Sequence, residues 1–99
     1  MSSDLCIGIV AKPDVLEIAA LEPRRSVVVT QFPATVMGLA ALIGFMAGYE
    51  TTVRLAISGV AALSVAFAIG KTPHLEVFIV SAAVADQPTA LAQYAERSI

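Results

Sequence analysis

The feature that most constrains this chain is a long stretch without charge. No charged residue occurs in residues 26–49, and only Arg54 interrupts the apolar run over residues 53–70. A helix rises about 1.5 Å per residue, so about 20 apolar residues cross a hydrocarbon core of ~30 Å. Pro33 lies near the start of the first run, where a helix can begin or bend. The pattern therefore predicts a first transmembrane helix over residues 26–49.

The second run predicts a second transmembrane helix over residues 55–70, ended by Gly70 and Pro73. One continuous helix would place Glu50 and Arg54 near the middle of the membrane, where a charge costs from ~2.5 kcal/mol upward. A hairpin with a connection at residues 50–54 avoids that cost and lets the two charges pair across one helical turn. We therefore expect an all-α membrane protein, built as a two-helix transmembrane hairpin.

The composition favours the same interpretation. Only 14% of the residues are charged and 58% are hydrophobic, with a mean hydropathy of +0.83. A domain this small has a large surface for its volume and needs many polar groups to coat it. The surplus of apolar residues predicts the lipid bilayer, other membrane-protein subunits or copies of the chain itself as partners.

The flanking segments are expected to be peripheral parts of one domain that covers residues 1–99. In residues 1–25, Pro13 opens a short amphipathic helix that ends before Pro23, whereas residues 5–10 fit a strand as well. Residues 71–99 are expected to form a peripheral C-terminal tail. Within it, residues 89–97 predict a short surface helix with Leu91 and Tyr94 on its apolar side.

Basic residues predict the orientation of the hairpin. They lie before the first apolar run and directly after the second, while the connection carries one basic residue beside one acid. The positive-inside rule then places both termini in the cytoplasm. The residues expected to anchor this topology are Arg24, Arg25, Glu50, Arg54 and Lys71.

Small residues recur every four positions in both apolar runs, and Gly44 and Gly48 form a GxxxG element. Residues four apart share a helix face, so two backbones can approach closely there. Whether the two faces meet each other or contact other subunits stays open. The predicted helix-packing interface consists of Ala40, Gly44, Gly48, Ser58, Ala62, Ala66 and Gly70.

The chain carries no recognised local motif for catalysis, phosphate binding or metal binding. His74 is the only histidine and has no second candidate ligand nearby, so we expect a solvated histidine at the membrane interface. Cys6 is the only cysteine and cannot form an intrachain disulfide. Scattered basic residues and a net charge of −2 argue against nucleic acid as a partner. We expect no enzyme activity, no cofactor and no metal.

Three functions fit these features. The first is an accessory or scaffolding subunit of a larger membrane complex, and the second is a self-assembling hairpin subunit of a ring or pilus-like filament. The third is a small soluble α/β interaction domain, with strands near residues 26–30, 52–58 and 75–81 and helices between them. Against the third, residues 34–48 have almost no polar face, whereas a helix that covers a sheet needs a solvated side.

Overall fold

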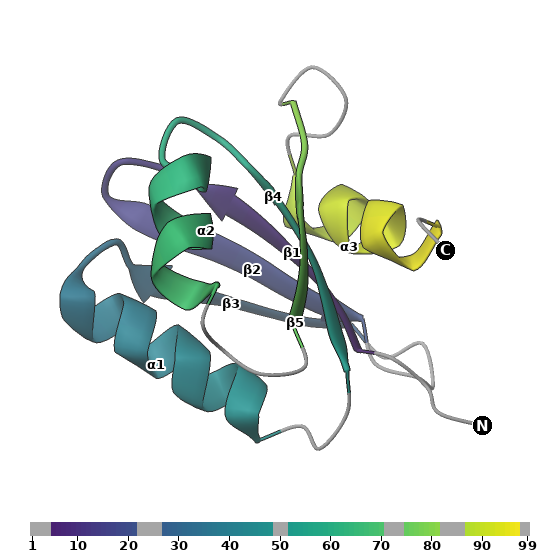
Figure 1. The fold of residues 1–99 in the computed structure, drawn as a ribbon, viewed down its shortest axis with the longest axis horizontal. Coiled ribbons are helices and arrows are strands. Elements are labelled where there is room, and N and C mark those ends of the chain that lie inside the picture. The colour runs from purple at the N-terminus through teal and green to yellow at the C-terminus, as the bar shows by residue number, and fades with distance from the viewer. Residues whose placement is uncertain (1–4, 22–26, 49–51, 71–74, 82–86, 98–99) are drawn as a thin grey trace.

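The structure is a computed structural model that describes residues 5–21, 27–48, 52–70, 75–81 and 87–97. Strands and helices alternate over most of these ranges, as Figure 1 shows. The elements in chain order are β1 (Leu5–Ala11), β2 (Val15–Leu21), β3 (Val27–Pro33), α1 (Val36–Ala47), β4 (Val53–Ser58), α2 (Ala62–Ile69), β5 (Leu75–Ile79) and α3 (Pro88–Arg97). The small α/β domain that the sequence analysis placed third is therefore the architecture of this chain.

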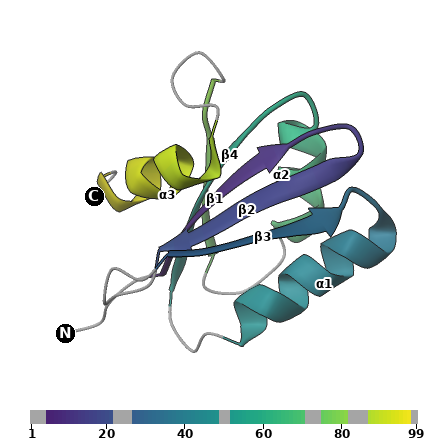
Figure 2. The same ribbon diagram turned by 180° about the vertical axis from the view of Figure 1, so that it is seen from behind.

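The strands form one five-stranded sheet in the order β3-β2-β1-β4-β5. β1 is antiparallel to β2 and parallel to β4, β2 is antiparallel to β3, and β4 is parallel to β5. The connections through α1 and α2 both cross the sheet in the direction of β5. Because such crossovers are almost always right-handed, both helices lie on the same face. α3 covers the other face (Figures 1 and 2).

The predicted transmembrane hairpin is wrong. Residues 26–49 contain strand β3 and the 12-residue helix α1, and residues 55–70 contain most of β4 and the 8-residue helix α2. A crossing needs about 20 helical residues, and no helix in the described ranges has both the length and the apolar character to cross a membrane. The predicted membrane localisation with cytoplasmic termini is therefore wrong as well. The membrane-subunit and filament-subunit functions depended on the hairpin and are also wrong.

The apolar runs are explained by burial inside the protein. β1 and β4 are central strands, and every residue of β1 and nearly every residue of β4 is buried. A strand covered on both faces needs apolar residues at successive positions, so its sequence resembles a membrane segment. Local breaks divide the runs into separate elements. Pro33 ends β3, and the Thr35 hydroxyl accepts a hydrogen bond from the Gly38 amide at 3.1 Å to cap α1.

The short amphipathic helix predicted after Pro13 is also wrong, because this segment is strand β2. Leu16, Ile18 and Ala20 alternate along β2 and join the core beneath α1 and α2. Their two-residue period is that of a strand, and pairing with β1 on one side and β3 on the other satisfies the backbone. The strand considered for residues 5–10 is present as β1.

The helix predicted near the C-terminus is present as α3, but it packs on the sheet instead of lying at a membrane surface. Leu91 is fully buried against the second core cluster, whereas Tyr94 is 39% exposed. The sheet beneath α3 has a floor of small residues, since Ala19, Gly8 and Ala56 are register partners on three adjacent strands. This floor lets the backbone of α3 approach β1 closely.

Candidate interaction surface

α1 and α2 carry no charged residue on any side, and Ser64 is the only polar residue in the two helices, which sets them apart from ordinary surface helices. On the inner side, Leu42 of α1 and Ile69 of α2 are fully buried against the sheet. On the outer side, Met37 is 82% exposed and Phe67 is 84% exposed. A helix that is hydrophobic on all sides is normally covered on all sides. We call the exposed part of this layer the apolar helical face; it consists of Val36, Met37, Val60, Leu63, Phe67 and the adjoining Ile79 of β5.

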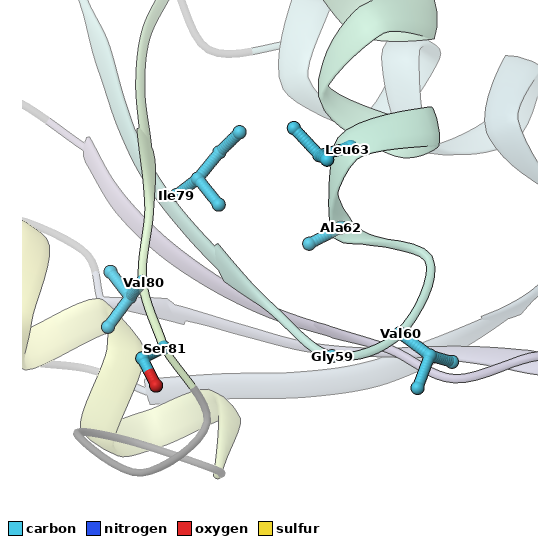
Figure 3. Close-up of a pocket in the computed structure, with 7 residues that line it drawn as sticks. All are labelled: Gly59, Val60, Ala62, Leu63, Ile79, Val80 and Ser81. Atoms are coloured by element: carbon cyan, nitrogen blue, oxygen red, sulfur yellow. The ribbon is translucent and has the colours of Figure 1, made fainter.

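A hollow of about 360 Å³ lies at one end of the apolar helical face, between the start of α2 and the end of β5. Figure 3 shows Leu63 and Ile79 facing each other across it. The hollow lies at the carboxyl ends of the parallel strands β4 and β5, the edge where open α/β sheets usually bind ligands. The described residues that line it are Gly59, Val60, Ala62, Leu63, Ile79, Val80 and Ser81.

The turn from β4 into α2 holds this end of the surface in place. Gly59 has a φ of 106°, a left-handed conformation that side chains with a Cβ rarely adopt. The amide of Ala61 donates a hydrogen bond to the carbonyl of Ala11 at 3.2 Å, which ties the turn to the end of β1. On the other wall, the amide of Val80 donates to the carbonyl of Ile57 at 2.8 Å and extends the pairing of β4 with β5. Both walls of the hollow are therefore held by backbone hydrogen bonds to central strands.

The chemistry of the hollow suits an apolar group. Its described lining residues are aliphatic or glycine apart from Ser81, and none of them is charged. Such walls favour a hydrocarbon or aromatic side chain, with the rim of the sheet left to contribute polar contacts. Within the described ranges, no group of three or more His, Cys, Asp or Glu residues is placed to hold a metal ion.

The small-residue stripe predicted on the first run lies on the outside of α1. Ala40, Gly44 and Gly48 are all exposed, and a Cβ built at Gly44 would meet no atom within 4 Å. The stripe therefore does not pack against α2. Its predicted role in contacts with other subunits is not tested by the fold of a single chain.

The second stripe is divided between two elements. Ser58 ends strand β4, while Ala62 and Ala66 lie on α2 and Gly70 follows it. Ala62 is buried in the main core, Ala66 is partly buried beside it, and Ser58 is 1% exposed. Within the described part of the chain, the Ser58 hydroxyl has no hydrogen-bond partner. Ser58, Ala62 and Ala66 therefore belong to the packing around the sheet, whereas Gly70 is exposed, and the four do not form one helix–helix seam.

Of the predicted topology anchors, only Arg54 lies in the described ranges; Arg24, Arg25, Glu50 and Lys71 lie outside them, as does His74. Arg54 is on β4, and its Nε lies 3.1 Å from Oε2 of Glu76 on β5. The two residues are register partners on the face that carries α3. Arg54 therefore pairs with a residue of the neighbouring strand, in a position unrelated to a membrane boundary.

Sequence reasoning did not single out Val60, Leu63 or Phe67, which dominate the apolar helical face. The signal was present in the sequence as the missing polar face of the apolar runs. It was used as an argument against an α/β fold, whereas the structure shows an α/β fold in which α1 and α2 lack that polar face.

Comparison with protein-family models and with curated proteins finds no match for this chain.

Proposed function

We propose that this chain is a small, non-catalytic interaction module whose apolar helical face docks onto an apolar surface of another protein chain. The observation that supports the proposal is the exposure of large hydrophobic side chains on α1 and α2, without a charged residue in residues 34–48 or 59–70. The two helices cover the same face of the sheet, and large exposed apolar areas on proteins mark sites of association. The hollow beside Leu63 would receive a side chain of the partner.

The magnitudes indicate that both helices take part. Full burial of one large aliphatic or aromatic side chain gains roughly 1.5–3 kcal/mol, so the four on α2, its preceding turn and β5 offer at most about 6–12 kcal/mol. Association costs about 4–15 kcal/mol in lost freedom of motion. The α2 side alone would therefore bind weakly, and a stable complex needs Val36 and Met37 of α1 as well.

A protein partner fits this surface better than a lipid headgroup region does. Helices that lie in a membrane interface combine an apolar face with a polar face rich in Lys and Arg, which attract anionic lipids. The outer sides of α1 and α2 carry neither type of residue. The core of a protein–protein interface, by contrast, is depleted in charge and enriched in aromatic residues and Met, as here at Phe67 and Met37.

Site-specific photo-crosslinking in the cells that naturally produce the protein tests this proposal. The photoreactive residue benzoylphenylalanine would replace Phe67, which is 84% exposed on the apolar helical face. Tyr94 is the matched control, because it is also aromatic and partly exposed but lies on α3, on the opposite side of the sheet. We expect a discrete protein adduct from position 67 and little or none from position 94.

A second variant separates docking from nonspecific reaction. Leu63→Glu places a charge beside the probe without touching the core, since Leu63 is 73% exposed. If a partner covers this face, the charge should remove most of the adduct at position 67, because an unpaired charge is costly to bury. Equal adducts at positions 67 and 94, adducts with lipid alone, or an adduct unaffected by Leu63→Glu would contradict the proposal.

A further inference from the structure

The strand β3 forms one edge of the sheet and has the properties of a pairing surface. It is the terminal strand in the order β3-β2-β1-β4-β5, and its seven residues, Val-Val-Val-Thr-Gln-Phe-Pro, include no charge. Natural sheets usually protect an edge with charged side chains, especially Lys. We propose that β3 pairs antiparallel with β3 of a second copy of this chain, which joins the two sheets across a two-fold axis. This inference concerns a different surface from the apolar helical face and does not depend on it.

The hydrogen bonds of the sheet identify which backbone groups of β3 face outward. The amide of Ala34 donates to the carbonyl of Asp14 at 3.2 Å, and this pair continues the register that places Val15 opposite Pro33. Because hydrogen-bonding direction alternates along a strand, Val28, Thr30 and Phe32 direct their amides and carbonyls toward β2. Val29 and Gln31 therefore direct theirs away from the sheet.

Pro33 agrees with this assignment. It lies an even number of residues from Val29 and Gln31, so its nitrogen also faces outward, where the absence of an N–H costs no hydrogen bond to β2. The edge thus offers three residues with both a donor and an acceptor, Val27, Val29 and Gln31.

One register uses the whole strand. With Thr30 of each copy on the two-fold axis, Val29 lies opposite Gln31 of the other copy, and their outward amides and carbonyls pair reciprocally. Val28 then lies opposite Phe32 on the side of α1, which forms an apolar cross-strand pair. Since β3 carries no charge, two identical edges meet without like-charge repulsion.

Helix α1 lies beside the edge strand and carries two small residues on the side that faces it. The ring of Phe45 lies 6.1 Å from that of Phe32, which marks the side of α1 turned toward the edge strand. Ala41 and Gly48, four positions before and three after Phe45, share this side of the helix and are both exposed. Small side chains therefore occupy two positions on this side of α1, and Met37, one turn before Ala41, is the large exposed side chain next to them.

Disulfide trapping tests the register. In a Cys6→Ala background, which removes the only native cysteine, Thr30→Cys would place two thiols opposite each other in a non-hydrogen-bonded pair. Such pairs have Cα atoms about 4.5 Å apart, which a disulfide can bridge. We expect Thr30→Cys to form a covalent dimer under mild oxidation. Val28→Cys is the matched control, because it lies opposite Phe32 and should remain uncrosslinked. Crosslinking of both variants alike, or of Val28→Cys alone, would overturn the proposal.

Sedimentation of the full chain tests the association itself. We expect a dimer whose self-association weakens about tenfold or more in Val29→Lys, because two lysines would face each other diagonally across the axis. Gln93→Lys, an exposed change on α3, should have no effect. A monomer at all concentrations would overturn the proposal. A dimer that survives Val29→Lys but is lost in Leu63→Glu would also overturn it, and would place the second copy on the apolar helical face.

Discussion

The carbonyl oxygen of Pro88, at the start of α3, occupies the place where a Cβ of residue 8 would lie on β1. Gly8 is therefore required for the packing of α3 on the sheet. Because the obstructing atoms belong to backbone, they cannot turn aside as a flexible side chain could. We expect Gly8→Ala to lower the free energy of unfolding by about 1–3 kcal/mol, as overpacking of a core usually does. Urea denaturation followed by circular dichroism measures this, and unchanged stability would show that α3 does not pack here.

Gly44→Ala is also a glycine-to-alanine substitution, but we expect it to stabilise the protein. Gly44 lies in the interior of α1, and a Cβ there would meet no atom within 4 Å. Alanine costs less backbone entropy than glycine in a helix, so we expect a gain of about 0.5–1 kcal/mol in the free energy of unfolding. A loss in the same denaturation assay would mean that another segment or chain already covers the exposed side of α1.

We expect that replacing Ser58 with alanine stabilises the fold. Its side chain is 1% exposed, and within the described residues its hydroxyl has no hydrogen-bond partner. A buried hydroxyl without a partner loses its hydration and gains nothing in return, at a cost of about 1–3 kcal/mol. We therefore expect Ser58→Ala to raise the midpoint of thermal unfolding, with the neighbouring Ala56→Ser as a control that should lower it.

The ion pair between Arg54 and Glu76 should contribute little to stability. The Glu76 side chain is 53% exposed, although that of Arg54 is only 16% exposed. Solvent screens the exposed partner, so Glu76→Gln should lower the free energy of unfolding by no more than about 1 kcal/mol. In 1 M NaCl, where the Debye length is only ~3 Å, the difference from the wild type should shrink. A loss several times larger, insensitive to salt, would indicate that Arg54 is effectively buried and depends on this carboxylate.

Part of the fold could be predicted from local sequence. The strands considered for residues 26–30, 52–58 and 75–81 correspond to β3, β4 and β5, and the helix over residues 89–97 corresponds to α3. Those segments combine β-branched residues or a clear apolar stripe with nearby Pro or Gly. β2 was missed because Val15, Leu16, Ile18 and Ala19 fit a helical period almost as well as a strand period, and only pairing with β1 and β3 decides between them.

The candidate site was harder to predict than the strands. The sequence shows that residues 34–48 and 59–70 carry no charge, but not which of their side chains the sheet covers. Leu42 and Met37 are equally apolar, yet one is fully buried and the other is 82% exposed. That difference arises from the side of α1 on which each residue lies and from the position of the sheet.

The amino-acid sequence by itself determined that this chain is unusually apolar for a small domain, and that its first apolar run has a break near Pro33. Only the tertiary structure decided what covers its apolar side chains. Hydropathy measures how strongly a side chain avoids water. Burial against neighbouring strands removes an apolar side chain from water as effectively as lipid does. The fold buries β1 and β4 on both faces and α1 and α2 on one, so most of the large exposed hydrophobic side chains lie on the apolar helical face and on β3.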